Sequence, residues 1–125
     1  MTGEPAGMAY AEPADLALVR EFVCRTAVGL GLSTPRADLL TIAVSELATN
    51  TLQHTGAGGR VRIWADNGRI CCEVTDRGSP QAFGRAMPAA DEPRGRGLAI
   101  VERICDEVGV SEGPDGTSVR ISLHR

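Results

Sequence analysis

The sequence contains no lysine, since all 13 of its basic residues are arginine. Lysine ammonium groups bind the nucleotide phosphates in P-loop NTPases and in ordinary protein kinases, so both classes are excluded. Schiff-base chemistry is excluded as well, because it needs a lysine amine. If this chain handles a nucleotide, it must use a metal ion, backbone amides or arginine instead.

Aromatic residues are also scarce, at 3% of the chain, and the net charge is -3. Nucleic-acid-binding proteins usually show a basic face and stacking rings, so this composition argues against that class. No segment approaches the roughly 18 consecutive apolar residues of a membrane span. Residues Met1 to Glu12 lack the charged start and apolar run of a signal peptide, so we expect a cytoplasmic protein.

Metal-binding cysteine patterns are missing too. The chain has 4 cysteines without a CxxC pair, and its histidines are His54 and His124. A structural zinc site is therefore not expected. The cysteines instead predict buried, apolar thiols in a reducing compartment.

The chain does contain regular hydrophobic periodicity, and 42% of its 125 residues are hydrophobic, which is enough for one buried core. Three- and four-residue steps predict helices, and alternation predicts strands. The chain is predicted to begin with two helices, Pro13–Leu30 and Pro35–Gln53, followed by two strands, Arg60–Asp66 and Arg69–Thr75. A lid over Arg77–Arg94 leads to a third helix from near Leu98, and two strands, Val108–Glu112 and Thr117–His124, end the chain. We expect residues 1–12 to be a flexible leader and residues 13–125 to form a single domain.

This order predicts a two-layer α/β sandwich. Asn67-Gly68 is typical of a tight hairpin turn, because both residues tolerate positive φ angles. Adjacent hairpins imply a mixed, mainly antiparallel sheet, and the amphipathic helices can cover one of its faces. The Gly-, Pro- and Ala-rich segment from Arg77 to Arg94 interrupts the pattern, and a loop of that length is often a functional lid.

Two polar residues of the second predicted helix are candidates for chemistry. Glu46 and Asn50 are four residues apart, so they share one helix face, which is not the apolar face. Asn50 can ligate Mg²⁺ through its side-chain oxygen, and Glu46 can accept a proton from an attacking hydroxyl or water. For this pair alone, an exposed polar helix face is the alternative.

Asp76 ends a predicted strand and precedes Arg77-Gly78. A carboxylate there can accept a hydrogen bond from an exocyclic amino group, and Gly78 would let a flat base approach the backbone. Thr117, at the start of the last strand, can donate or accept at the same edge of the base. Taken singly, each of these segments is also an ordinary turn.

Gly95-Arg96-Gly97 precedes the third predicted helix. Backbone amides at a helix N-terminus can bind phosphate oxygens, and the helix dipole favours the anion. Arg94 and Arg96 are candidates for phosphate contacts, with solvated surface charge as the alternative. A dinucleotide-binding fingerprint is excluded, because a loop precedes these glycines and residue 100 is isoleucine.

In their order and spacing, these segments resemble the N, G1, G2 and GT boxes of the GHKL ATPases, a superfamily that includes gyrase, Hsp90, MutL and the catalytic domains of histidine kinases. The matching segments are Ser45–Asn50 with His54, Asp76–Gly78, Arg94–Leu98 and Gly116–Thr117. The resemblance spans residues from about Thr34 to the C-terminus. It implies the Bergerat α/β sandwich, with ATP held beneath a lid.

Within that superfamily, the short chain, the leading helix and the segment Glu46–His54 are most similar to the anti-sigma-factor serine/threonine kinases. The resemblance implies that Glu46 is the catalytic base, Asn50 the Mg²⁺ ligand and Asp76 the adenine-recognising acid. It implies that the other nucleotide contacts come from Gly78, Arg94, Gly95, Arg96, Gly97, Leu98 and Thr117. The implied cofactors are ATP and Mg²⁺.

The same resemblance implies partners. They are a sigma factor and an anti-anti-sigma protein that accepts phosphate on a serine, with the chain acting as a homodimer and without direct contact to nucleic acid or a membrane. One alternative is a detached ATP-binding domain of a histidine kinase, although the first predicted helix, Ala14 to Leu30, contains no histidine to accept phosphate. Another is a regulatory module that binds ATP without phosphotransfer, which has no need of a base at Glu46.

Overall fold

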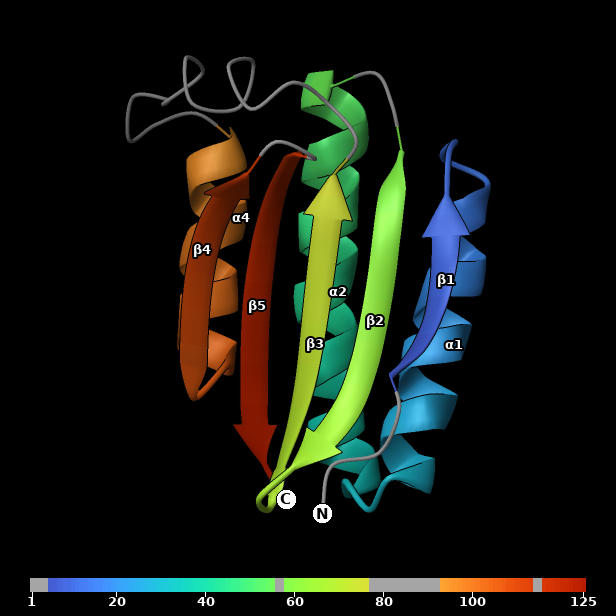
Figure 1. The fold of residues 1–125 in the computed structure, drawn as a ribbon, viewed down its shortest axis with the longest axis vertical. Helices are drawn as coiled ribbons and strands as arrows, with labels where there is room; N and C mark the ends of the chain where they lie inside the picture. Colours follow the sequence, from blue (N-terminus) through green and yellow to red (C-terminus); the bar gives the residue numbers. More distant parts are fainter. Residues whose placement is uncertain (1–4, 56–57, 77–92, 114–115) are drawn as a thin grey trace.

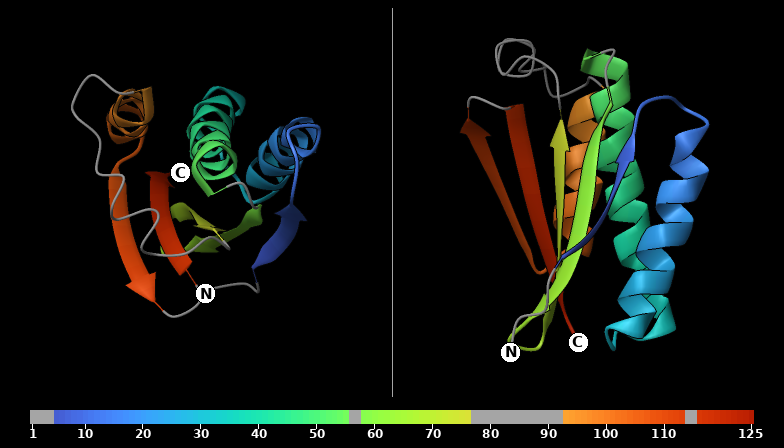
Figure 2. Two further views of the ribbon diagram at one scale, coloured as in Figure 1. Left: turned by 90° about the horizontal axis from the view of Figure 1, so that it is seen from above. Right: turned by 45° about the vertical axis from the view of Figure 1, so that its right-hand side comes forward.

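A five-stranded antiparallel sheet, covered on one face by helices, forms the fold (Figures 1 and 2). The structure is a computed structural model that describes residues 5–55, 58–76, 93–113 and 116–125. The strands are β1 (Ala6–Tyr10), β2 (Gly59–Asp66), β3 (Arg69–Asp76), β4 (Glu107–Gly113) and β5 (Gly116–His124), and the helices are α1 (Asp15–Gly29), α2 (Thr34–Thr55) and α4 (Pro93–Ile104). The strand order is β1-β2-β3-β5-β4. The predicted two-layer α/β sandwich is therefore confirmed, and the pairings between its strands are all antiparallel.

Strand β1 corrects the expectation of a flexible leader over residues 1–12. Residues Ala6–Tyr10 pair with β2 along the whole length of β1, with Ala6 opposite Ile63 and Tyr10 opposite Gly59. The segment carries little intrinsic strand preference, because two of its five residues are alanine and one is glycine. Pairing with a neighbouring strand and burial of Tyr10 outweigh that weak preference.

Helix α4 begins at Pro93 and not near Leu98. Proline is favourable at the first position of a helix, because it has no N–H to leave unpaired there and its φ angle is already helical. As a result, Gly95 and Gly97 lie inside the first turns of the helix and not ahead of it. The segment 77–92, which makes up most of the predicted lid, lies outside the described residues.

The β2–β3 hairpin forms as predicted. Asn67 and Gly68 have φ angles of 52° and 79°, the left-handed values that a two-residue hairpin turn requires. The turn sets the register in which Asp66 pairs with Arg69 and Gly59 pairs with Asp76. The carboxyl group that ends β3 is therefore placed by a turn at the opposite end of the hairpin.

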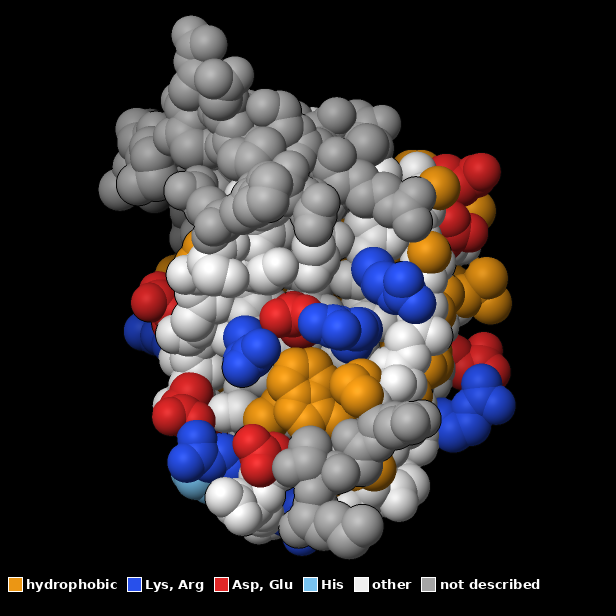
Figure 3. Space-filling view, in the orientation of Figure 1, with side chains coloured by type: hydrophobic (Ala, Val, Ile, Leu, Met, Phe, Trp, Pro, Cys, Tyr) orange, Lys and Arg blue, Asp and Glu red, His pale blue; other side chains and the backbone are white. Residues whose placement is uncertain are grey.

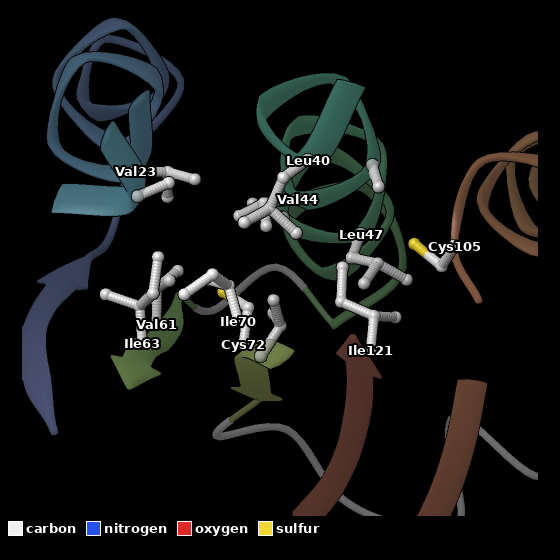
Figure 4. Packing of buried hydrophobic residues seen from close by; sticks show 14 of the residues in the cluster. Val23, Leu40, Val44, Leu47, Val61, Ile63, Ile70, Cys72, Cys105 and Ile121 are labelled. Carbon is white, nitrogen blue, oxygen red and sulfur yellow. The ribbon is translucent and has the colours of Figure 1, made fainter. Parts of the chain in front are cut away.

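The hydrophobic core lies between the sheet and the helices (Figure 4). The predicted apolar faces are buried there, with Val19, Val23 and Ala27 from α1 and Leu40, Ala43, Val44 and Leu47 from α2. They pack on inward-facing strand residues, of which Val61, Ile63, Ile70, Cys72, Ile121 and Leu123 are at most 1% exposed. Helix α2 packs against both α1 and α4, so it is the central helix of its layer.

The cysteine thiols are free, and most are buried. Cys71, Cys72 and Cys105 are buried, and Cys24 is half-buried. Burial raises the pKa of the Cys105 thiol to about 11, with a smaller contribution from the negative charge of Asp106. Within the described residues, no group of His, Cys, Asp and Glu side chains is placed to hold a metal ion.

The other face of the sheet is polar. Glu73 accepts hydrogen bonds from Arg62 and from Arg120, and the Arg120 guanidinium lies 5.3 Å from the centre of the Trp64 ring. Burial alone would raise the pKa of Glu73, but the two arginines outweigh it and hold the pKa below its usual value. Figure 3 shows this face, with basic side chains around an acidic one beside an apolar patch. None of the helices in the described ranges is long and apolar enough to cross a membrane.

The neighbouring leucines of α2 allow a direct test of this packing. Leu40 is fully buried, whereas Leu39 is 37% exposed. We predict that Leu40→Ala lowers the free energy of unfolding by about 2–5 kcal/mol, because it removes buried apolar surface and leaves a cavity. Leu39→Ala should change it by less than about 1 kcal/mol. Urea unfolding of the two variants measures both values, and equal losses would contradict the assigned helix face.

Candidate functional site

The described candidate residues from the sequence lie on elements that meet at one end of the sandwich. Strands β1 and β3 end there, β5 begins there, α2 reaches its C-terminal end and α4 begins (Figure 1). This arrangement follows from the antiparallel order, because the chain returns to the same end after every second element. The site is therefore built from at least four segments that are distant in sequence.

A single row of residues crosses the sheet at this end. Tyr10 of β1 pairs with Gly59 of β2, and Gly59 pairs with Asp76 of β3. Thr75 pairs with Ser118 of β5, which brings Asp76 next to Thr117. Side chains of paired residues lie on the same face of a sheet. Tyr10, Asp76 and Thr117 are all buried, with 3%, 3% and 2% exposure.

Gly116 allows β5 to begin directly against Asp76. Its φ angle is +130°, a conformation that other residues rarely adopt. A Cβ atom at this position would lie 2.2 Å from the carbonyl oxygen of Asp76 and 3.2 Å from its carboxylate Oδ1. Glycine at position 116 is thus what lets Thr117 approach the carboxylate.

The Thr117 hydroxyl is a buried polar group without a hydrogen-bond partner among the described residues. Leaving such a group unpaired costs about 1–3 kcal/mol, so native proteins rarely keep one without a water or a ligand. Beside it lies the carboxylate of Asp76, which is a strong acceptor. A planar ligand edge that carries a donor next to an acceptor could form hydrogen bonds to both groups.

Tyr10 lies at the other side of Asp76 in the same row. Burial raises the pKa of the Tyr10 hydroxyl to about 12, the nearby Thr51 lowers it, and the negative charge of Asp76 raises it further. Thr51 donates its own hydroxyl proton to the carbonyl oxygen of Leu47 at 3.0 Å. The Tyr10 oxygen lies close to Thr51 but makes no hydrogen bond of good geometry within the described residues.

Glu46 and Asn50 project from the C-terminal half of α2. Both are half-buried, whereas the neighbouring Leu47 and Ala48 are buried in the core. The two polar side chains therefore lie at the border between the core and the surface, on one face of the helix as predicted. This placement leaves a carboxylate and an amide partly exposed in the half of α2 that leads to the same end of the sheet as Asp76.

Helix α4 presents its N-terminus at this end (Figure 1). The first backbone N–H groups of a helix have no partner within it, and here they belong to Arg94 and Gly95, since Pro93 has no N–H. They can bind an anion, helped by the positive end of the helix dipole. The structure describes the backbone but not the side chains of residues 93–98, and Gly78 lies outside the described residues.

Sequence reasoning missed two residues of the row, Tyr10 and Gly59. Both lie outside the predicted motifs, and Tyr10 falls in the segment expected to be a leader. The signal that could have found the strand is the alternation of Ala6, Met8 and Tyr10, which is weak over so short a segment. The close packing around residue 59 requires glycine, because a Cβ there would lie 2.3 Å from the carbonyl oxygen of Thr75 and 2.8 Å from the Tyr10 hydroxyl.

Comparison with known proteins agrees with this geometry. A family described as "histidine kinase-like ATPase domain" matches residues 9–123 of the chain. Among solved structures, the crystal structure of the RsbU and RsbW domains of Rv1364c from Mycobacterium tuberculosis is similar, with a TM-score of 0.73 and 20% sequence identity. The match covers 98% of this chain but 32% of that one, so this chain spans about a third of its length. At this identity the likeness shows a shared fold. No curated protein sequence matches the chain.

The raised pKa of Tyr10 predicts a specific pH dependence. Folding favours the neutral hydroxyl, so this stabilisation is complete below the unfolded pKa of about 10 and is lost as the pH rises toward the folded value of about 12. Relative to Tyr10→Phe, the wild type should lose about 2 kcal/mol of unfolding free energy across that range. Urea unfolding of both proteins measures the difference, and the cysteine thiols that titrate nearby are common to both. A constant difference from pH 8 to 12 would contradict the burial of this hydroxyl.

Proposed function

Because the chain belongs to the family of histidine kinase-like ATPase domains, we propose that it is an ATP-dependent serine/threonine kinase that regulates a sigma factor. One observation carries the proposal: a buried carboxylate, Asp76, lies beside the buried hydroxyl of Thr117, which has no hydrogen-bond partner among the described residues, at the end of the sheet where α2 ends and α4 begins. This combination of acceptor, hydroxyl and helix ends fits a nucleotide that has its base at the sheet and its phosphates toward the helices.

Asp76 and Thr117 would bind the base. The Asp76 carboxylate accepts a hydrogen bond from the exocyclic amino group of adenine, and Thr117 bonds the adjacent ring edge directly or through a water. Guanine carries a carbonyl oxygen where adenine carries the amino group, so the same carboxylate would repel it. Gly116 supports this recognition, because it keeps the start of β5 against Asp76. Gly78 would line the base, and it follows Asp76 closely in the sequence.

Asn50 and the N-terminus of α4 would hold the phosphate end. Mg²⁺ in nucleotide sites is bound by one or two protein ligands together with phosphates and water. A single amide oxygen from Asn50 fits that requirement. The backbone N–H groups of Arg94 and Gly95 would bind phosphate oxygens, with Arg96, Gly97 and Leu98 continuing the helix, and the guanidinium groups of Arg94 and Arg96 would add positive charge. When bound, Mg·ATP supplies the phosphoryl group and the ion neutralises its charge.

Glu46 would act as the general base. It lies one helical turn before Asn50, so a carboxylate on this face can accept the proton of a hydroxyl aligned with the phosphate end. Its half-buried position leaves access for the serine of a protein substrate. A pure binding module needs no carboxylate at this point, and this favours phosphotransfer over binding alone.

The substrate and partners are inferred from likeness. The solved structure reported above contains an RsbW domain, and the segment Glu46–His54 is similar to the anti-sigma-factor kinases. On that basis the phosphate acceptor is a serine of an anti-anti-sigma protein, and the second partner is a sigma factor that the chain sequesters, acting as a homodimer.

Base recognition by Asp76 gives the first functional prediction. Asp76→Asn replaces a carboxylate by an amide of almost equal size, so the fold should persist while the hydrogen bond to the adenine amino group weakens. A hydrogen bond to a charged group contributes about 1.5–3 kcal/mol, so the dissociation constant of Mg·ATP should rise about 10- to 100-fold. Isothermal titration calorimetry with ATP and with GTP measures the affinity and the selectivity. Wild-type protein that binds no ATP at millimolar concentration would contradict the proposal.

The different roles proposed for Glu46 and Asn50 give the second functional prediction. Glu46→Ala should lower the rate of phosphotransfer about 10²- to 10⁴-fold, because a general base contributes that much, and should leave ATP binding almost unchanged. Asn50→Ala should instead weaken the Mg²⁺-dependent part of binding. Glu21→Ala is a suitable control, since Glu21 is exposed on α1 and forms a surface ion pair with Arg25. Transfer of labelled phosphate to the serine protein measures the rate, and full activity of Glu46→Ala would exclude the assigned base.

A further inference from the structure

The Tyr10 side chain reaches across β2 toward Asp76. Tyr10, Gly59 and Asp76 are register partners on three adjacent strands, and Gly59, in the middle, has no side chain. A Cβ on Gly59 would lie 2.8 Å from the Tyr10 hydroxyl oxygen and 3.1 Å from the ring carbon that carries it. The hydroxyl therefore lies over Gly59, and Asp76 is the residue paired with Gly59 on the next strand.

Two buried polar atoms without a hydrogen-bond partner among the described residues lie in the row that contains Asp76. Among the described residues, the buried side-chain oxygen and nitrogen atoms without a hydrogen-bond partner are the hydroxyl oxygens of Tyr10 and Thr117. They lie at the two sides of Asp76 in the row that crosses the sheet. Buried hydroxyls of this kind are normally satisfied by bound water or ligand. Two of them around one carboxylate indicate that solvent or ligand enters the row on both sides of Asp76.

We propose that Tyr10 is a positioning residue for Asp76: its hydroxyl, through one bound water, holds the carboxylate in the orientation that accepts a hydrogen bond from the amino group of adenine. This inference rests on the proposed function, because it concerns the selectivity of the same base site. It adds a residue from β1, outside the motifs that carry the resemblance, and it assigns that residue a role in choosing the base.

The chemistry of the two groups fits this role. Tyr10 is 3% exposed and keeps its hydroxyl proton at physiological pH, so it is a donor. Asp76 is an acceptor whose negative charge acts on that hydroxyl. A water between them would accept from Tyr10 and donate to the carboxylate, which as an acceptor of several hydrogen bonds would also accept from the base. Gly59 maintains this path, because any side chain there would displace Tyr10.

The test compares Tyr10→Phe with the wild type on two nucleotides. Phenylalanine keeps the ring packed over Gly59 and removes the hydroxyl alone. The nucleotides are Mg·ATP and the Mg²⁺ complex of purine riboside triphosphate, which lacks the amino group at the 6-position. Thr41→Val is the control, since it removes a half-buried hydroxyl of α2 that donates to the Ala37 carbonyl oxygen away from the row.

The expected result is a loss of selectivity. Tyr10→Phe should raise the dissociation constant of ATP about three- to tenfold, the range of one ordinary hydrogen bond. It should change that of purine riboside triphosphate by less than about twofold, and Thr41→Val should change neither. The effects of Tyr10→Phe and Asp76→Asn on ATP should also be less than additive in the double variant, since one acts through the other.

Several outcomes would overturn the inference while leaving the proposed function intact. They are wild-type ATP affinity in Tyr10→Phe, equal losses on both nucleotides, or full additivity with Asp76→Asn. Wild-type protein that binds neither nucleotide would overturn the proposed function itself. If Tyr10→Phe does not fold, an NMR titration of the wild-type protein tests the inference instead, since Tyr10 is the single tyrosine and its signal is unambiguous. Its hydroxyl-bearing carbon should shift with Mg·ATP more than with the purine analogue, and equal shifts would overturn the inference.

Discussion

The register of the antiparallel strands is the constraint on which the site depends. Asp76 faces the helices because it pairs with Gly59, and that pairing is fixed eight residues away by the turn at Asn67 and Gly68. A slip of one residue would turn Asp76 to the opposite face, where Glu73 and its arginines lie. The same slip would expose Ile70, Cys72 and Val74, so burial of the core and placement of the carboxylate are enforced together. The hydrophobic effect that stabilises the sheet thus also holds the polar site in place.

Charged side chains have different surroundings on the two faces of the sheet. On the open face, arginine and glutamate side chains neutralise one another across neighbouring strands, as at Arg62, Glu73 and Arg120. On the covered face, the described residues of the row on either side of Asp76 carry hydroxyl groups or no side chain, as at Tyr10, Thr117 and Gly59. The fold thus places these ion pairs on one face of the sheet and the buried hydroxyl groups on the other.

Much of this could be predicted from the sequence, and the failures have physical causes. Long amphipathic patterns, as in α2, and the Asn67-Gly68 turn act locally, so α1, α2 and the central hairpin were predicted correctly. The position of Asp76 and Thr117 at strand ends was predicted too, because each follows or begins an alternating segment. Strand β1 was missed because its stability comes from pairing with β2, which no short window contains. The start of α4 was misplaced because glycines normally weaken a helix, and only Pro93 marks the true first turn. The roles of Glu46, Asn50 and the α4 residues stay predictions.

Strand β1 connects the first described residues of the chain to the row that contains the buried carboxylate of Asp76. Viewed along the sequence, the stretch before α1 looks dispensable, since it is short, rich in small residues and far from every motif. Viewed across the sheet, it is the outer strand of the row, because Tyr10 ends the row that Asp76 occupies. A chain trimmed to begin at its first helix would keep every motif and still lose that strand. A peptide tag or a fused domain placed before residue 6 would be attached to a strand that ends at this row, so a force on the tag would act on the residues around Asp76.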